Sequence, residues 1–249
     1  MFTLKSEPQD KLSVVKQGFH FYLHTFWVAL PYSLLAAGFI LVPQLFIDVT
    51  APSAVENFLH QTPFVLATIV SWLIGFILLS ALIFRLHCIT EQLPLTFLNS
   101  ILHALFKLIP LLLLGIVYTL MIISGTLFLI IPGIILAVSL MFSFILFITD
   151  NQNVLPTLLT SHRLVWGNWW HALLIISLPL LIDIAVSLGV LLLLFTLFKH
   201  YQSGLLELYR SLCFANIVIQ ALFIPLIFCT ALSLLNDLRC RQAAPLPRW

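Results

Sequence analysis

An acidic residue lies in the middle of one of the most apolar stretches of the chain. Asp183 is the only charged residue of the run 173–197, and Ser187 follows it by one helical turn. Asn216 and Gln220, four residues apart in the next apolar run, could meet them between two helices. A charged carboxylate facing lipid costs at least about 2.5 kcal/mol, so we expect Asp183 to face the bundle interior or to be protonated. The site would couple a proton or substrate to transport, or else form a structural hydrogen bond.

Histidine spacing suggests a metal site only weakly. His20 and His24 are four residues apart, which lets two imidazoles on one helix share an ion. No carboxylate or cysteine joins them at a recognisable spacing, and the four cysteines form no Cys-x-x-Cys pair. We therefore expect neither a metal ion nor another cofactor.

Catalytic motifs are also missing from the sequence. It contains neither the Gly-x-x-x-x-Gly-Lys phosphate loop nor the Gly-x-Ser-x-Gly elbow, and its acids are few and scattered. The sequence thus predicts a protein that is not an enzyme; a membrane enzyme of lipid metabolism is a less favoured alternative. The net charge of +2, with no basic run, predicts no nucleic-acid partner.

A cluster of indoles precedes the apolar run that holds Asp183. Trp166, Trp169 and Trp170 follow Arg163 closely, as in the aromatic belts found where helices leave a membrane. We expect this segment to anchor the chain at the interface. A more specific hypothesis is that Arg163 and the indoles contact a phospholipid headgroup.

The composition shows what must position these residues. Of the 249 residues, 61% are hydrophobic and only 8% charged, and the mean hydropathy is +1.13, which is far more apolar than a soluble domain requires. Because about 20 apolar residues cross a bilayer, the apolar runs predict an all-α integral membrane protein with six transmembrane helices in a single domain. The expected spans are 26–47, 64–84, 108–126, 132–148, 173–197 and 212–235.

The third and fourth spans come from one uncharged stretch between Lys107 and Asp150. As a single helix it would be about 60 Å long, twice the thickness of the hydrocarbon core, so it must turn back. We place the hairpin turn at Gly125, Pro132 and Gly133, because proline suits the first turn of a new helix and glycine loosens the end of the preceding one.

The basic residues predict the orientation of the six spans. Nine of the 11 Lys and Arg residues fall on one side, which the positive-inside rule makes cytoplasmic. Asp48 and Glu56 lie in a loop without Lys or Arg, which indicates the outer side. Both termini are therefore expected in the cytoplasm.

A weak internal repeat accompanies these spans. Gln92-Leu93-Pro94-Leu95 and Val154-Leu155-Pro156-Thr157 each follow a helix end and lead through a semi-polar stretch into the next span. We predict three parallel repeats, each an interfacial amphipathic helix, at 14–26, 95–108 or 158–170, followed by two spans. The alternative is that these preludes are long ends of tilted spans.

Two segments carry a family resemblance. The segment 125–136, with Ile131-Pro132-Gly133, and the segment 160–170, ending in Gly167-Asn168-Trp169-Trp170, resemble the YciC-like family of uncharacterised bacterial inner-membrane proteins. A related membrane domain is attached to some glycerophosphodiester phosphodiesterases, and the segment 235–241 is also similar to the family's last span. The resemblance implies a multi-pass protein of the bacterial inner membrane, but no phosphodiesterase domain accompanies it here.

These observations favour a non-enzymatic inner-membrane protein that acts in membrane or envelope homeostasis. Its expected partners are membrane lipids and other membrane proteins. The alternative is a small-molecule or proton-linked transporter with Asp183 in the bundle interior.

Overall fold

Apolar helices dominate the computed structural model, which describes residues 7–41, 43, 62–150, 153–201 and 205–243. All regular structure in these ranges is helical. In chain order the helices are α1 (Lys11–Leu41), α3 (Thr62–Thr90), α4 (Phe97–Phe106), α5 (Leu108–Phe128), α6 (Ile130–Leu140), α7 (Ser143–Asp150), α8 (Val154–Val165), α9 (Trp169–Tyr201) and α10 (Leu205–Ala243).

Within the described residues, six helical segments are long and apolar enough to cross a membrane, which confirms the predicted all-α membrane architecture. They are Lys11–Leu41, Val65–Thr90, Leu108–Leu127, Pro132–Asp150, Trp169–Phe198 and Glu207–Ala243. The fourth joins α6 and α7 across a turn at 141–142. The end of the predicted first span, the loop with Asp48 and Glu56, and the basic residues Lys5 and Arg248 lie outside the described residues.

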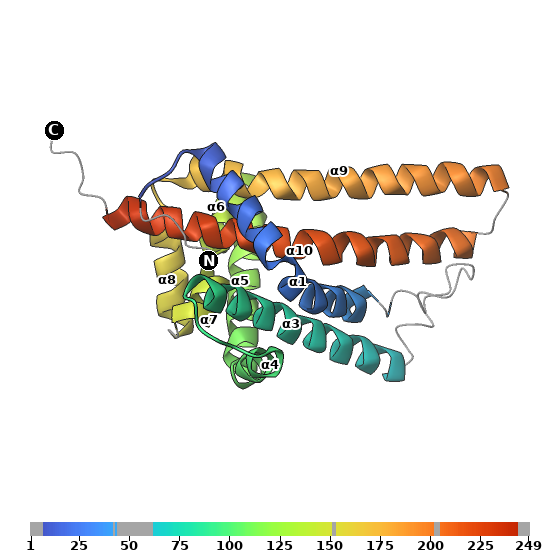
Figure 1. Ribbon diagram of the computed structural model, residues 1–249, viewed down its shortest axis with the longest axis horizontal. Helices are drawn as coiled ribbons and strands as arrows, with labels where there is room; N and C mark the ends of the chain where they lie inside the picture. Colours follow the sequence, from blue (N-terminus) through green and yellow to red (C-terminus); the bar gives the residue numbers. More distant parts are fainter. Residues whose placement is uncertain (1–6, 42, 44–61, 151–152, 202–204, 244–249) are drawn as a thin grey trace.

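Four of these helices form a layer in the order α9, α10, α1, α3 (Figure 1). The backbones of α1 and α10 lie close together: a Cβ atom at Gly18 would be only 2.8 Å from Cα of Thr230. The hydroxyl of Ser33 donates a hydrogen bond to the carbonyl of Ala221, 2.7 Å away. Small residues therefore bring the two backbones together, as in other membrane helix pairs.

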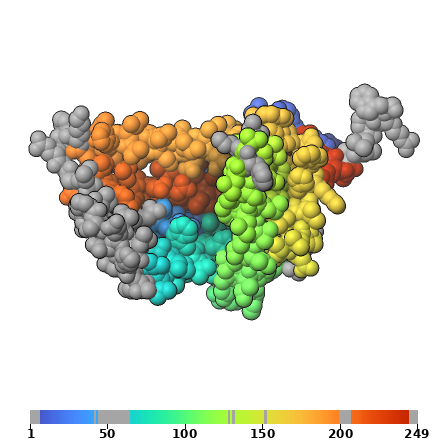
Figure 2. Space-filling model, turned by 180° about the vertical axis from the view of Figure 1, so that it is seen from behind, coloured from blue at the N-terminus to red at the C-terminus, as the bar shows by residue number. Residues whose placement is uncertain are grey.

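Helices α5 and α6 form a hairpin that runs across the direction of α9 and α10 (Figures 1 and 2). The turn is at Leu129, within the range 125–133, and a Cβ atom at Gly133 would overlap the side chain of Thr126. Both ends of the α6–α7 segment meet the same end of the α9–α10 pair. Ile135 shares a cavity with the start of α9, and Asp150 forms an ion pair with Arg239 of α10 at 2.6 Å.

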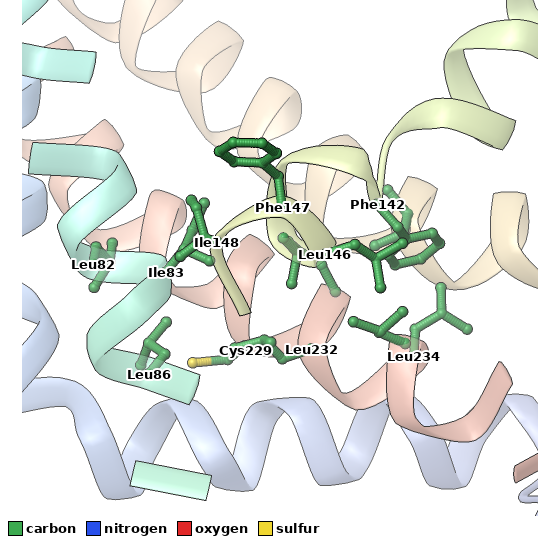
Figure 3. Close-up of a cluster of buried hydrophobic side chains, with 14 of the residues drawn as sticks. Leu82, Ile83, Leu86, Phe142, Leu146, Phe147, Ile148, Cys229, Leu232 and Leu234 are labelled. Carbon is green, nitrogen blue, oxygen red and sulfur yellow. The ribbon is translucent and has the colours of Figure 1, made fainter. Parts of the chain in front are cut away.

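The core lies at the end of the layer where α3 and α10 finish and α9 begins. Helix α7 packs between α3 and α10, so that Leu82, Phe147 and Leu232 belong to one buried cluster (Figure 3). By contrast, no residue in the most apolar 18-residue stretch of α9 is buried. In a bilayer, this exposed apolar surface would face lipid.

Two of the three predicted interfacial helices are separate elements. Helix α4 begins after Thr96, whose side chain accepts a hydrogen bond from the backbone N–H of Asn99, and α8 spans Val154–Val165. The segment 14–26 instead lies within α1, which is unbroken from Lys11 to Leu41, because residues 27–30 contain no glycine or proline and the helix continues through Pro31.

Candidate functional site

The predicted intramembrane site joins α9 to α10 at one edge of the layer. The Nε2 atom of Gln220 donates to both carboxylate oxygens of Asp183, at 3.3 and 3.2 Å. Ser187 and Asn216 lie on the same two helices, and all four side chains are half-buried. Because α9 packs mainly against α10, Asp183 lies between two helices at the periphery of the bundle.

A second acid, which the sequence analysis did not single out as a site, is almost completely buried. Asp237 on α10 is 1% exposed. Its carboxylate accepts hydrogen bonds from the backbone N–H of Gln9 at 2.6 Å and from Nε of Arg241 at 2.8 Å. It also contacts Nε2 of His171 at 2.8 Å. A buried charge requires such partners, and here they connect the N-terminal segment, α9 and α10.

Only the pairing of Asp237 with Arg241 can be predicted from residue spacing. Arg241 follows Asp237 by one helical turn, so the two side chains lie on the same face of α10. Gln9 and His171 are remote in sequence, so no spacing rule connects them to this acid. The Nη2 atom of Arg241 also donates a hydrogen bond to the carbonyl of Gln9, which gives the N-terminal segment a second link to α10.

The three indoles of the predicted interfacial anchor line one cavity, of about 560 Å³. Trp166 and Trp170 are 66% and 69% exposed. The remaining lining comes from Lys11, Ile135, Gly167, Asn168 and His171. Arg163 is not among the lining residues; it is exposed, and its carbonyl accepts a hydrogen bond from Gln242 at 2.8 Å.

An apolar groove of about 640 Å³ runs beside α3. Its side chains are hydrophobic except for Thr68, and they come from α1, α3 and α5: Ile40, Thr68, Ile69, Trp72, Leu73, Phe76, Leu79 and Leu112. Two further cavities share Phe76 with it and extend along α5 and α7. Near its wall, a Cβ atom at Gly75 would meet Ile40 at 2.5 Å, so glycine permits the close approach of α1 and α3.

A half-buried histidine lies near the junction of α4 and α5. His103 stacks on Phe84, with ring centroids 3.8 Å apart, and its Nε2 atom has no hydrogen-bond partner among the described residues. Burial, and then the charge of Lys107, lower the pKa of His103. Burial also lowers the pKa of Lys107, whose Nζ donates to the carbonyl of Ile148 at 3.3 Å. In the described part of the chain, no three metal-ligating side chains come together.

Comparison with known proteins places the chain in a family. No curated protein and no solved structure matches it. A family model, described as "Uncharacterised protein family (UPF0259)", matches residues 44–232, which include α3 to α9 and most of α10. The matched range contains every lining residue of the indole-lined cavity and of the apolar groove except Lys11 and Ile40 of α1. The match covers more than half of the sequence, and this chain therefore belongs to the uncharacterised protein family UPF0259.

Proposed function

We propose that this protein is a non-enzymatic component of the bacterial inner membrane that supports membrane or envelope homeostasis by holding lipid and contacting other membrane proteins. Both termini would lie in the cytoplasm. The observation that carries the proposal is the apolar groove beside α3. Its volume falls within the range of small-molecule sites, and its lining suits a hydrocarbon chain.

An acyl chain is the occupant that best fits the groove. Wall residues such as Ile69 and Trp72 are 51% and 59% exposed, so a bound chain would exchange contact with the bulk bilayer for contact with a shaped surface. Burial against lipid carries no hydrophobic driving force, so packing would have to retain the chain. A rigid wall, with Gly75 set tightly against Ile40, supplies such packing.

Photo-crosslinking after removal of bulk lipid tests this proposal. A benzoyl-phenylalanine replaces Ile69 in the groove, and a matched control replaces Leu192, which is 64% exposed on α9 and outside the groove. The purified protein is washed with detergent, irradiated and analysed by mass spectrometry. We expect lipid adducts at position 69 and none at 192; equal adducts at both positions, or none at either, would overturn the proposal.

The alternative function is a small-molecule or proton-linked transporter that works through Asp183, which lies between α9 and α10. The hydrogen bonds from Gln220 favour it, because they hold the carboxylate within the layer. Asp183 lies outside the four cavities described for this structure, so we rank transport second. Proton-driven uptake that is abolished by Asp183→Asn would reverse the ranking.

We also propose that the family is related to YciC-like proteins, and to the membrane domain attached to some glycerophosphodiester phosphodiesterases. The segments 125–136 and 160–170 support this relation. They form the α5–α6 turn and the α8–α9 junction, which border the indole-lined cavity.

A further inference from the structure

The lining of the indole-lined cavity includes a cationic side chain and no acidic one. Among its eight lining residues are one lysine, Lys11, and one histidine, His171, and none is acidic. Lys11 makes no ion pair with any described carboxylate. Asp10 precedes it in sequence but is not part of the lining. The cavity is therefore suited to an anion.

The nearest buried acid does not cancel this charge. The carboxylate of Asp237 already contacts Gln9, His171 and Arg241. Its charge is balanced by Arg241, with which it forms an ion pair at 2.8 Å. Lys11 remains available to a ligand.

Further donors surround the cavity. The start of α9 forms part of its wall, and the first N–H groups of a helix have no partner within the helix. Gly167 adopts φ of +91°, a conformation that favours glycine, and so allows the sharp turn into α9.

Asp237 also explains how the two sides of the cavity are held together. It binds Gln9, two residues before Lys11, and it binds His171 in the first turn of α9. One carboxylate thus fixes the lysine-bearing segment against the donor-bearing helix end. Such an arrangement preorganises a binding site.

The surroundings identify the source of the anion. Trp166 and Trp170 are largely exposed beside the cavity, and indoles of this kind prefer the region of lipid headgroups. The apolar surface of α9 begins directly beyond them and would accommodate acyl chains. A phosphate attached to a lipid fits both parts, whereas free phosphate uses only one.

We propose that this cavity binds the phosphate of a phospholipid headgroup, with Lys11 as its cation and the start of α9 as its donor surface. The inference rests on the proposed lipid-contact function and adds the headgroup class and its residues. It differs from the sequence-based hypothesis in its cation, which is Lys11 in place of Arg163.

Binding of a soluble, short-chain phosphatidylglycerol tests the site. We compare the full-length protein with Lys11→Gln and with Lys16→Gln, a control for an exposed lysine of the same helix that does not line the cavity. We expect Lys11→Gln to weaken binding about tenfold, since hydrogen bonds to charged groups are among the stronger ones, and Lys16→Gln to leave it unchanged. Equal affinities for all three proteins would overturn the proposal.

A competition experiment separates a lipid headgroup from free phosphate. Inorganic phosphate should compete poorly, and competition equal to that of the lipid would overturn the headgroup assignment. The adducts at position 69 are read separately, so the groove and the headgroup site can fail independently.

Discussion

Helices α3 and α10 of the layer and both arms of the crosswise hairpin are almost equally apolar, yet they lie in different directions. The mean hydropathy of the most apolar 18-residue stretch is 2.4 in α3 and α10 and 2.3 in both arms of the hairpin. Close contacts account for the difference. The layer is held by small residues and by hydrogen bonds such as that from Ser33 to Ala221, whereas the α6–α7 arm is tied at both ends to one end of α9 and α10. Hydropathy therefore determines that these helices lie in a membrane, whereas specific contacts determine the direction in which each helix runs.

The largest expected effect, an all-or-none difference, is in the labelling of a cysteine placed at the hairpin turn. Leu129 is 67% exposed at the turn. Six parallel spans would place it on the same side as Glu207, at the start of α10. The crosswise hairpin predicts that a single cysteine at 129 does not react with an impermeant thiol reagent from that side. If cysteines at 129 and 207 are both labelled from that side, the hairpin spans the membrane parallel to the other helices, and the crosswise orientation is wrong.

Loss of the buried acid should produce the largest change in stability. Asp237→Ala removes the partner of Arg241 and leaves the N–H of Gln9 without its acceptor. Breaking a buried ion pair costs about 3 to 5 kcal/mol of unfolding free energy. The effect is measured by titration with sodium dodecyl sulfate in mixed micelles.

Asp150→Ala is the matched control for that change. Its ion pair with Arg239 also ties α7 to α10, but the two side chains are 26% and 41% exposed. A partly exposed pair contributes about 1 kcal/mol or less. Equal losses in both variants would contradict the distinction between buried and peripheral links.

A methyl group added at the contact between α1 and α10 should have an intermediate effect. In Gly18→Ala the new Cβ would lie 2.8 Å from the backbone of Thr230, so α1 and α10 must move apart. Overpacking of this kind costs about 1 to 3 kcal/mol. At Gly189 on α9 a Cβ meets nothing within 4 Å, so Gly189→Ala should be neutral or stabilise by up to about 1 kcal/mol. Equal midpoints in thermal unfolding would contradict the tight pairing of α1 and α10.

The smallest expected effect is a pH dependence at His103. Its folded-state pKa is lowered below 6.5 by burial and by Lys107, so below 6.5 the unfolded chain binds this proton more readily than the folded chain. Stability from this group is present above that range and is lost as the pH falls. His103→Gln should therefore reduce the drop in thermal midpoint between pH 7 and about 5. An unchanged drop would show that this histidine does not contribute.

Composition and periodicity could predict the helical class, the six apolar segments and the turn near Gly133, because each depends on residues close in sequence. The contact between Asp183 and Gln220 was also foreseeable, since few polar partners exist within these spans. The cavity at Lys11 could not be predicted, because Lys11 and His171 meet only through the fold. Burial of Asp237 was hidden for the same reason: an acid near two arginines at a helix end is typical of a solvated surface.

The central claim is that this protein contacts lipid and that its helix bundle is closed, with no aqueous pathway to Asp183. Cysteine accessibility in intact membranes tests this claim most directly. With the native cysteines replaced, single cysteines are placed at Asp183, Ser187 and Asn216, with a reference at Leu93, which is exposed in the loop after α3. We expect an impermeant thiol reagent to label position 93 and to leave the other three protected from both sides. Labelling at 183 would reveal an aqueous pathway beside the carboxylate, contradict the closed bundle and favour transport.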